Sequence, residues 1–167
     1  VTTEYENSKY QIEQTIEAAK EIDLPILWFW PNIDAGANNT SGALRTYREL
    51  SNPKNIHFFK NMEGRDFLKL LYNSKCLIGN SSVGIRECSF LGVPVINIGS
   101  RQNKRERGTN VIDVNYDKNE ILIAVKKILS GRHKIDQSEI YGSGKSGQEI
   151  AEILSNVKLK FHKTIQY

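Results

Sequence analysis

The sequence contains no long apolar run and few of the residues that bind metals. Of its 167 residues, two are cysteine, three are histidine and one is methionine. No stretch approaches the roughly 18 consecutive apolar residues that a transmembrane helix requires. The first residues also lack the charged-then-apolar order of a secretory signal peptide. We therefore expect a cytoplasmic protein that does not engage a membrane.

The cysteines and histidines are isolated from one another. Cys76 falls in a predicted buried strand, Cys88 falls on a predicted helix, and His57, His133 and His162 are scattered. Metal sites and disulfide frameworks require closely or regularly spaced ligands, and neither pattern occurs in this sequence. We expect two reduced, packed thiols, no bound metal and no cofactor.

The composition is typical of one folded domain. Hydrophobic residues make up 39% of the chain and charged residues 25%. A domain of this size buries roughly 70% of the surface that its unfolded chain exposes. With no internal repeat and no low-complexity segment, the sequence predicts a single domain over residues 1–167. The absence of an initiating methionine is typical of a fragment, either an engineered domain or a proteolytic product.

The formal net charge of +4 raises the question of nucleic-acid binding. The positive charge is divided between the loop 101–107 and a tail that contains Lys158, Lys160 and Lys163. Neither segment has the interleaved aromatic residues on which bases stack. The charge therefore favours a small anionic ligand over a nucleic acid.

Helical and strand patterns alternate along the chain. Helices are predicted over residues 5–22, 43–50, 63–72 and 117–129, from residue 82 and from near residue 143; strands are predicted over 25–30, 55–59, 75–79, 93–98 and 110–114. Strands separated by helices predict an α/β fold, with a parallel sheet, flanking helices and right-handed crossovers.

The segment Lys75–Glu87 predicts a strand that passes through Gly-Asn-Ser-Ser into a helix. A helix N-terminus leaves backbone N–H groups without partners and attracts phosphate oxygens. Ser81 or Ser82 is a natural N-cap, and Glu87 follows about one and a half turns later, where it suits a ribose diol. An ordinary capped helix with a solvated glutamate is the alternative.

A polar, basic loop over Ser100–Gly108 follows the predicted strand 93–98. Ligands of open parallel sheets bind beyond the carboxyl ends of the strands, so this loop leaves the sheet at the ligand-binding edge. Arg101, nearest the strand end, is the best candidate for a bidentate contact with phosphate or sugar. The remaining cations are expected to be solvated or paired with Glu106: Lys104, Arg105 and Arg107.

A second glycine-rich segment, Gly142–Gly147, matches G-x-G-x-x-G, and its Gly-Lys-Ser resembles the end of a phosphate-binding P-loop. Glu139 stands where the P-loop requires glycine, and residues 132–141 are too polar for the core strand that must precede it. A flexible turn and N-cap before the last helix is the preferred interpretation.

Three segments resemble the UDP-N-acetylglucosamine 2-epimerases, specifically the hydrolysing branch that releases N-acetylmannosamine and UDP. They are GNSSVGIRE, FLGVPVINIGSRQNKRERG and NVIDVNYD. Pro31–Gly36 and Ile140–Gly144 are similar to further family segments, so the resemblance extends from Val1 to about Leu154. It implies the C-terminal, Rossmann-like half of a two-domain GT-B-type enzyme, with the N-terminal catalytic domain absent.

The resemblance also implies site residues and partners. UDP and UDP-N-acetylglucosamine are the implied ligands, and the missing N-terminal domain and a second copy of the chain are the implied protein partners. The implied contacts are Ser81 and Ser82 with phosphate, Glu87 with ribose, Asn32 and Met62 with the uracil or ribose side, and Arg101 with the leaving group or sugar as a catalytic residue. For Asn32 and Asp34 a role in the turn itself is an equal alternative.

In the related enzymes C2 loses a proton and UDP leaves C1, giving a glycal that water converts to the 2-epimer, a step of sialic acid biosynthesis. The family's catalytic carboxylates lie mainly in the absent domain, so the chain alone is expected to be inactive. The loop GSRQNKRERG favours the hydrolysing branch. A non-hydrolysing epimerase, a GT-B glycosyltransferase and a stand-alone nucleotide-binding module are the alternatives.

The start of the chain departs from the family pattern. In the family a first strand and a His-Pro pair precede the match to Val1–Thr3, and that strand lies centrally in the sheet. Its loss leaves three outcomes: a gap in the sheet, closure by the neighbouring strands, or a strand supplied by another chain.

Overall fold

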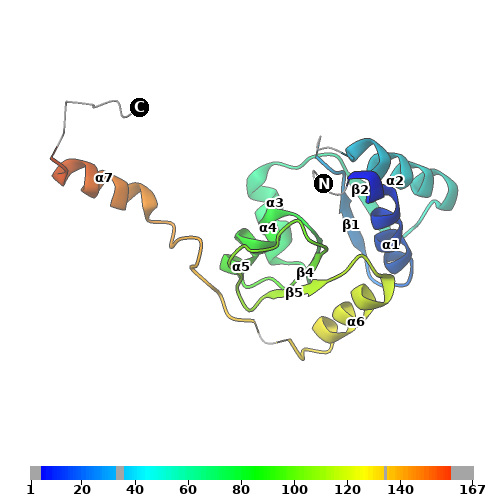
Figure 1. The fold of residues 1–167 in the computed structure, drawn as a ribbon. Helices are drawn as coiled ribbons and strands as arrows, with labels where there is room; N and C mark the ends of the chain where they lie inside the picture. Colours follow the sequence, from blue (N-terminus) through cyan, green and yellow to red (C-terminus); the bar gives the residue numbers. More distant parts are fainter. Residues whose placement is uncertain (1–4, 33–35, 134, 159–167) are drawn as a thin grey trace.

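The computed structural model describes residues 5–32, 36–133 and 135–158 of the chain. In this part of the chain, short parallel strands are covered by helices, which confirms the predicted α/β class (Figure 1). The strands are β1 (Ile26–Phe29), β2 (Ile56–Phe59), β3 (Leu77–Gly79), β4 (Val95–Ile98) and β5 (Val111–Val114). The helices are η1 (Tyr5–Asn7), α1 (Ser8–Lys20), α2 (Ala37–Ser51), α3 (Gly64–Tyr72), α4 (Ser82–Ile85), α5 (Glu87–Leu91), α6 (Lys118–Leu129) and α7 (Ser146–Asn156).

Two helices differ from the sequence-based prediction. Helix α2 begins at Ala37 rather than at residue 43. Its N-cap is Gly36, which adopts a φ of 82°, a conformation that glycine takes without steric cost and that lets the helix begin at the next residue. The single helix expected from residue 82 is divided at Arg86, whose φ of −99° and ψ of −74° separate α4 from α5.

The described strands form two parallel sheets instead of one. Strand β1 pairs with β2, and β3, β4 and β5 pair in that order, but no ladder joins β1 to β3. Strand β4, with a neighbour on each side, is buried at every residue, whereas β3 is half-buried throughout and Leu27 in β1 is 38% exposed. The expectation that Lys75–Gly79 forms a buried strand is therefore wrong, because β3 lies at a sheet edge.

Helix α1 packs against both sheets. Ala18 belongs to a buried cluster formed with β4, β5 and α6, whereas Ile16 and Ala19 belong to a second cluster formed with α2 and β2. Polar contacts strengthen the packing of α1 against α6. The Lys118 backbone N–H donates to Gln14 Oε1 at 3.2 Å, and the Lys118 ammonium pairs with Glu21. Helix α1 thus connects two sheets that share no backbone ladder in the described part of the chain.

A third cluster supports the segment that leads into the candidate site. It contains Leu71 of α3, Cys88 of α5, and Val93 and Val95 at the start of β4. The Phe67 ring of α3 meets Phe29 of β1 edge to face at 5.1 Å between ring centroids, so α3 also contacts the β1–β2 sheet. These contacts fix α5, and with it the position of Glu87 at its first turn.

Helix α7 extends away from the rest of the molecule and has no buried residue (Figure 1). The connection to it lies over α5 and the basic loop, because the Ser138 backbone N–H donates to the Ser89 carbonyl at 3.1 Å and Tyr141 Oη donates to the Glu106 carbonyl at 2.8 Å. Gly142 and Gly144 have positive φ values of 117° and 82°, which agrees with the predicted turn. Among the described helices, none is both long and apolar enough to span a bilayer.

We expect the backbone amides on the open edge of β1 to exchange rapidly with solvent. The N–H groups of Ile26 and Trp30 donate to carbonyls of the β2 segment at 2.8 and 2.9 Å, so those of Leu27 and Phe29 face the other edge. In hydrogen-exchange NMR, the amides of Leu27 and Phe29 should exchange at least about tenfold faster than that of Ile96 in β4. Equal protection of all three would mean that the edge is covered.

Candidate functional site

The strand–turn–helix segment at the end of β3 forms the first half of the site. Gly79 ends β3 with a φ of 146°, and Ser81 is extended, with φ −71° and ψ 144°. Of the two serines that the sequence left open, Ser81 is the N-cap, because its Oγ accepts a hydrogen bond from the Val83 backbone N–H at 3.4 Å. Ser82 is half-buried as the first residue of α4.

Helix α4 has only four residues, so its dipole is small. What the turn offers an anion is a pair of backbone donors, since the N–H groups of Ser81 and Ser82 have no partner within the described residues. The buried Asn110 holds α4 against the sheet, because its Nδ2 donates to the Gly84 carbonyl at 3.3 Å and to the Val93 carbonyl at 3.1 Å. The turn is therefore fixed by tertiary hydrogen bonds more than by its own helix.

Glu87 opens the second short helix and is half-buried. One of its carboxylate oxygens, Oε2, is shielded from solvent and has no hydrogen-bond partner in the described part of the chain. This burial differs from the alternative expected from the sequence, an ordinary capped helix with a solvated glutamate. A buried acceptor without a donor is costly, on the order of 1–3 kcal/mol or more for a charged group. A ligand that brings hydroxyl donors to this oxygen would remove that cost.

The basic loop between β4 and β5 forms the second half of the site. Arg101, Lys104 and Arg105 are exposed. Arg107 is half-buried and pairs with Asp113 of β5, and its guanidinium also donates to the Gln102 carbonyl at 2.6 Å. The alternatives expected for Arg107, solvation or pairing with Glu106, are therefore wrong, because β5 carries a carboxylate directly beside the returning loop.

Gln102 links the loop to the turn, and the sequence analysis missed it. Its Nε2 donates to the Asn80 carbonyl at 2.8 Å, so the residue next to Arg101 contacts the residue next to Ser81. The structure therefore brings Arg101 and the Ser81–Glu87 segment to one edge of the β3–β4–β5 sheet. A buried amide in a loop of charged residues has no distinctive sequence signal, since glutamine is usually exposed.

The two remaining sequence-predicted residues belong to the other sheet. Asn32 is exposed beyond β1, and Met62 is half-buried beyond β2. Because β1 and β2 are parallel, both residues follow carboxyl ends at the same sheet edge. No hydrogen bond between described residues joins either side chain to Ser81, Glu87 or Arg101. Asp34 lies outside the described residues.

The thiols next to the site are poor nucleophiles. Burial raises the pKa of Cys76 to about 11. Burial, and secondarily the charge of Glu87, raises the pKa of Cys88 to about 12. Both thiols are protonated at neutral pH, in agreement with the expectation of packed, unreactive cysteines. The described residues contain no cluster of histidine, cysteine, aspartate and glutamate able to hold a metal ion.

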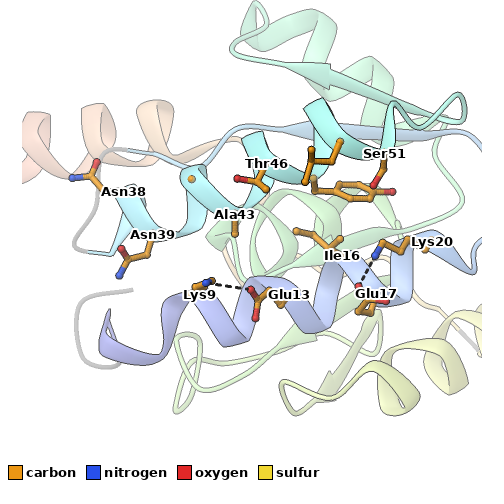
Figure 2. Close-up of a pocket in the computed structure, with 13 residues that line it drawn as sticks. Lys9, Glu13, Ile16, Glu17, Lys20, Asn38, Asn39, Ala43, Thr46 and Ser51 are labelled. Carbon is orange, nitrogen blue, oxygen red and sulfur yellow. Dashed lines mark hydrogen bonds and ion pairs between the residues drawn. The ribbon is translucent and has the colours of Figure 1, made fainter.

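A separate groove of about 550 Å³ lies between α1 and α2 (Figure 2). Its charged side chains are largely engaged with one another, since Lys9 pairs with Glu13 at 3.9 Å and Lys20 pairs with Glu17 at 2.5 Å. Lys20 also lies 5.3 Å from the centroid of the Tyr47 ring. None of the residues that line the groove belongs to the turn or to the basic loop.

The sequence profile of the family described as UDP-N-acetylglucosamine 2-epimerase matches residues 1–155. The chain belongs to this family. It is 34% identical over 159 residues to the UDP-N,N'-diacetylbacillosamine 2-epimerase (hydrolyzing) of Legionella pneumophila, covering 95% of this chain and 41% of that protein. It is 32% identical over 158 residues to the UDP-N-acetylglucosamine 2-epimerase of Neisseria meningitidis, covering 93% of this chain and 41% of that protein. This epimerase-family chain thus spans less than half the length of these two relatives.

The fold agrees with that of solved family members. The crystal structure of Methanocaldococcus jannaschii UDP-GlcNAc 2-epimerase in complex with UDP-GlcNAc and UDP matches with a TM-score of 0.69. The match covers 88% of this epimerase-family chain and 41% of that one at 22% identity. The predicted GT-B-type, Rossmann-like fold and the family resemblance are therefore both confirmed.

We expect Gly99→Ala to destabilise the β4 end of the site. Gly99 has a φ of 75°, and a Cβ at this position would overlap the Tyr116 ring. Positive φ costs an alanine roughly 1–2 kcal/mol, and overpacking adds about 1–3 kcal/mol, so urea unfolding should show a loss of about 2–5 kcal/mol.

Gly131→Ala is the matched control for this substitution. Gly131 has a similar φ of 69° but no heavy atom within 4 Å of the added Cβ. Only the backbone cost should remain, a loss of roughly 1–2 kcal/mol. An equal loss of unfolding free energy in the two variants would show that the overlap with Tyr116 does not contribute to the destabilisation.

Proposed function

We propose that the chain is the C-terminal, UDP-binding domain of a hydrolysing 2-epimerase that converts UDP-N-acetylglucosamine to N-acetylmannosamine and UDP. The observation that carries this proposal is the buried, unpartnered Oε2 of Glu87, five residues after the donors of Ser82. A ribose diol and the attached diphosphate would bring hydroxyl donors to this oxygen and anionic oxygens to the backbone donors of the turn. Family membership supplies the reaction class.

In this proposal the diphosphate accepts hydrogen bonds from the backbone N–H groups of Ser81 and Ser82 and from the Ser82 hydroxyl. The ribose hydroxyls donate to Glu87. Arg101 is an exposed residue of the loop that Gln102 ties to the same turn, and the planar donors of a guanidinium suit a bidentate contact with the diphosphate or the sugar. Asn32 and Met62 complete the uracil or ribose side from the second sheet.

The proposed reaction has two steps. A base removes the proton from C2 as the C1–O bond breaks, and the electron pair leaves with the UDP diphosphate, giving a glycal. Water then adds across the C1–C2 double bond to give the 2-epimer. The domain described here would stabilise the departing diphosphate, whereas acid and base groups would come from the remainder of the parent enzyme. The chain alone would bind UDP without turnover.

The hydrolysing branch is favoured by the name of the Legionella pneumophila relative, which also raises a second substrate, a UDP-linked N,N'-diacetylbacillosamine. The Neisseria meningitidis relative, named without the term hydrolyzing, keeps the simple UDP-N-acetylglucosamine 2-epimerase as the competing assignment. Release of free UDP and a free 2-epimer from each nucleotide sugar, measured with the full-length parent and no acceptor, separates these functions. With N-acetylmannosamine as product, the proposed role is cytoplasmic and belongs to sialic acid biosynthesis.

We expect UDP to bind this chain weakly and Glu87→Gln to weaken it further. In an NMR titration with UDP, the amides of residues 80–87 should shift. Glu87→Gln should reduce the UDP affinity by about 1–3 kcal/mol, since it removes a charge-assisted acceptor. Inorganic diphosphate, which carries no ribose, should bind the variant nearly as well as the original chain.

Two outcomes of that titration would contradict the proposal. Shifts confined to other parts of the chain would refute the site. An equal loss for UDP and diphosphate would make Glu87 a structural residue. Glu106→Gln is the control, because Glu106 is an exposed carboxylate of the basic loop.

We expect Arg101→Ala in the full-length parent to lower kcat more than it weakens UDP binding. A guanidinium at the departing diphosphate interacts most strongly as negative charge develops in the transition state. Steady-state kinetics should show a fall in kcat, whereas Arg105→Ala, an exposed cation of the same loop, should retain activity. An unchanged kcat with a raised KM would limit Arg101 to substrate binding.

A further inference from the structure

Gln102 is the most buried side chain of the basic loop. It is 2% exposed, whereas its neighbours Arg101, Asn103 and Lys104 are exposed. Burying a polar amide without hydrogen bonds is unfavourable. The burial of Gln102 in a loop otherwise rich in solvated charges therefore calls for a specific reason.

The side-chain amide of Gln102 reaches across to the segment after β3. Its Nε2 donates to the Asn80 carbonyl at 2.8 Å. Asn80 lies between Gly79, whose φ of 146° turns the chain, and the N-cap Ser81. A hydrogen bond at this carbonyl fixes the rotation of the peptide unit whose nitrogen belongs to Ser81. The contact therefore sets the direction of a backbone donor in the proposed diphosphate site.

The backbone of Gln102 is held in turn by the strands behind it. Its carbonyl accepts from Arg107 Nη2 at 2.6 Å, and Arg107 pairs with Asp113 of β5. Asp113 Oδ1 also accepts from Asn97 Nδ2 of β4 at 2.7 Å. A continuous series of polar contacts therefore runs from the ends of β4 and β5 through Gln102 to the turn after β3.

We propose that Gln102 is a positioning residue, which orients the Asn80–Ser82 turn for the diphosphate without itself touching the ligand. The inference rests on the proposed function, since it assumes that the turn binds the diphosphate of UDP. It also assigns Arg107 to holding Gln102, so that this cation supports the loop and is not a phosphate ligand. The Oε1 of Gln102 is buried and accepts no hydrogen bond from the described residues. Replacing the amide therefore removes the hydrogen bond from Nε2 to the Asn80 carbonyl and leaves no donor that had been paired with Oε1.

The test compares Gln102→Met with the original chain. Methionine has nearly the same length and volume as glutamine but cannot donate to the Asn80 carbonyl. The expected result is a loss of about tenfold in UDP and inorganic diphosphate affinity, the effect of roughly one hydrogen bond, with unchanged affinity for uridine. Uridine lacks phosphate but retains the ribose that contacts Glu87, so a loss restricted to phosphate-bearing ligands separates positioning from a general structural role.

Asn103→Met is the matched control, because the Asn103 side chain is exposed next to Gln102. It should leave all three affinities unchanged. Gln102→Glu is the second variant, for use if Gln102→Met does not fold. At pH 8 its carboxylate has no proton to donate to the Asn80 carbonyl, so the same selective loss is expected.

The outcomes distinguish this inference from the function on which it rests. If the original chain binds UDP and Gln102→Met binds UDP equally well, the positioning role is overturned. Equal loss of UDP, diphosphate and uridine in a folded variant would also overturn it and make Gln102 structural. If the original chain binds neither UDP nor diphosphate at residues 80–87, the proposed function itself fails.

Discussion

The packing of α1 against two separate sheets is the constraint on which the rest of the structure depends. Strands β1 and β3 share no ladder, so hydrogen bonds between strands do not join the two sheets. Apolar contacts of α1, through Ala18 on one side and Ile16 and Ala19 on the other, provide the connection together with the Phe67–Phe29 contact of α3. Such contacts are non-directional and tolerate sliding more readily than a ladder does. The candidate residues are divided in the same way, because Asn32 and Met62 follow strands of the β1–β2 sheet, whereas the turn and the basic loop follow strands of the β3–β4–β5 sheet.

Within the β3–β4–β5 sheet, buried polar contacts determine which charged groups are available to a ligand. Arg107 pairs with Asp113 and donates to the Gln102 carbonyl, so its charge is engaged within the domain. Glu87 keeps one shielded oxygen without a donor. In the proposed function, the engagement of Arg107 and the shielded oxygen of Glu87 favour a nucleotide diphosphate over an extended polyanion.

The chain covers less than half of its relatives, which fits a domain that binds the ligand without carrying the acid and base groups. The chain spans 41% of the Legionella pneumophila and Neisseria meningitidis relatives, and the groups assembled in it bind and orient an anion. No pair of carboxylates for acid and base chemistry is brought together among the described residues of the turn and loop. Chemistry at the sugar therefore belongs, in the proposed function, to the part of the parent enzyme that faces this site.

The sequence by itself determined the parallel α/β class, the family, the Gly-Asn-Ser-Ser turn and the loop beyond β4, because these depend on local hydrophobic periodicity and on contiguous motifs. Only the tertiary structure decided that the sheet is divided, that Arg107 pairs with Asp113, and that Gln102 is buried against Asn80. Gln102 and Asn80 are 22 positions apart, and the choice of Asp113 over the adjacent Glu106 depends on how β5 lies beside the loop. Contacts of this kind are set by the packing of distant segments, which local sequence patterns do not encode.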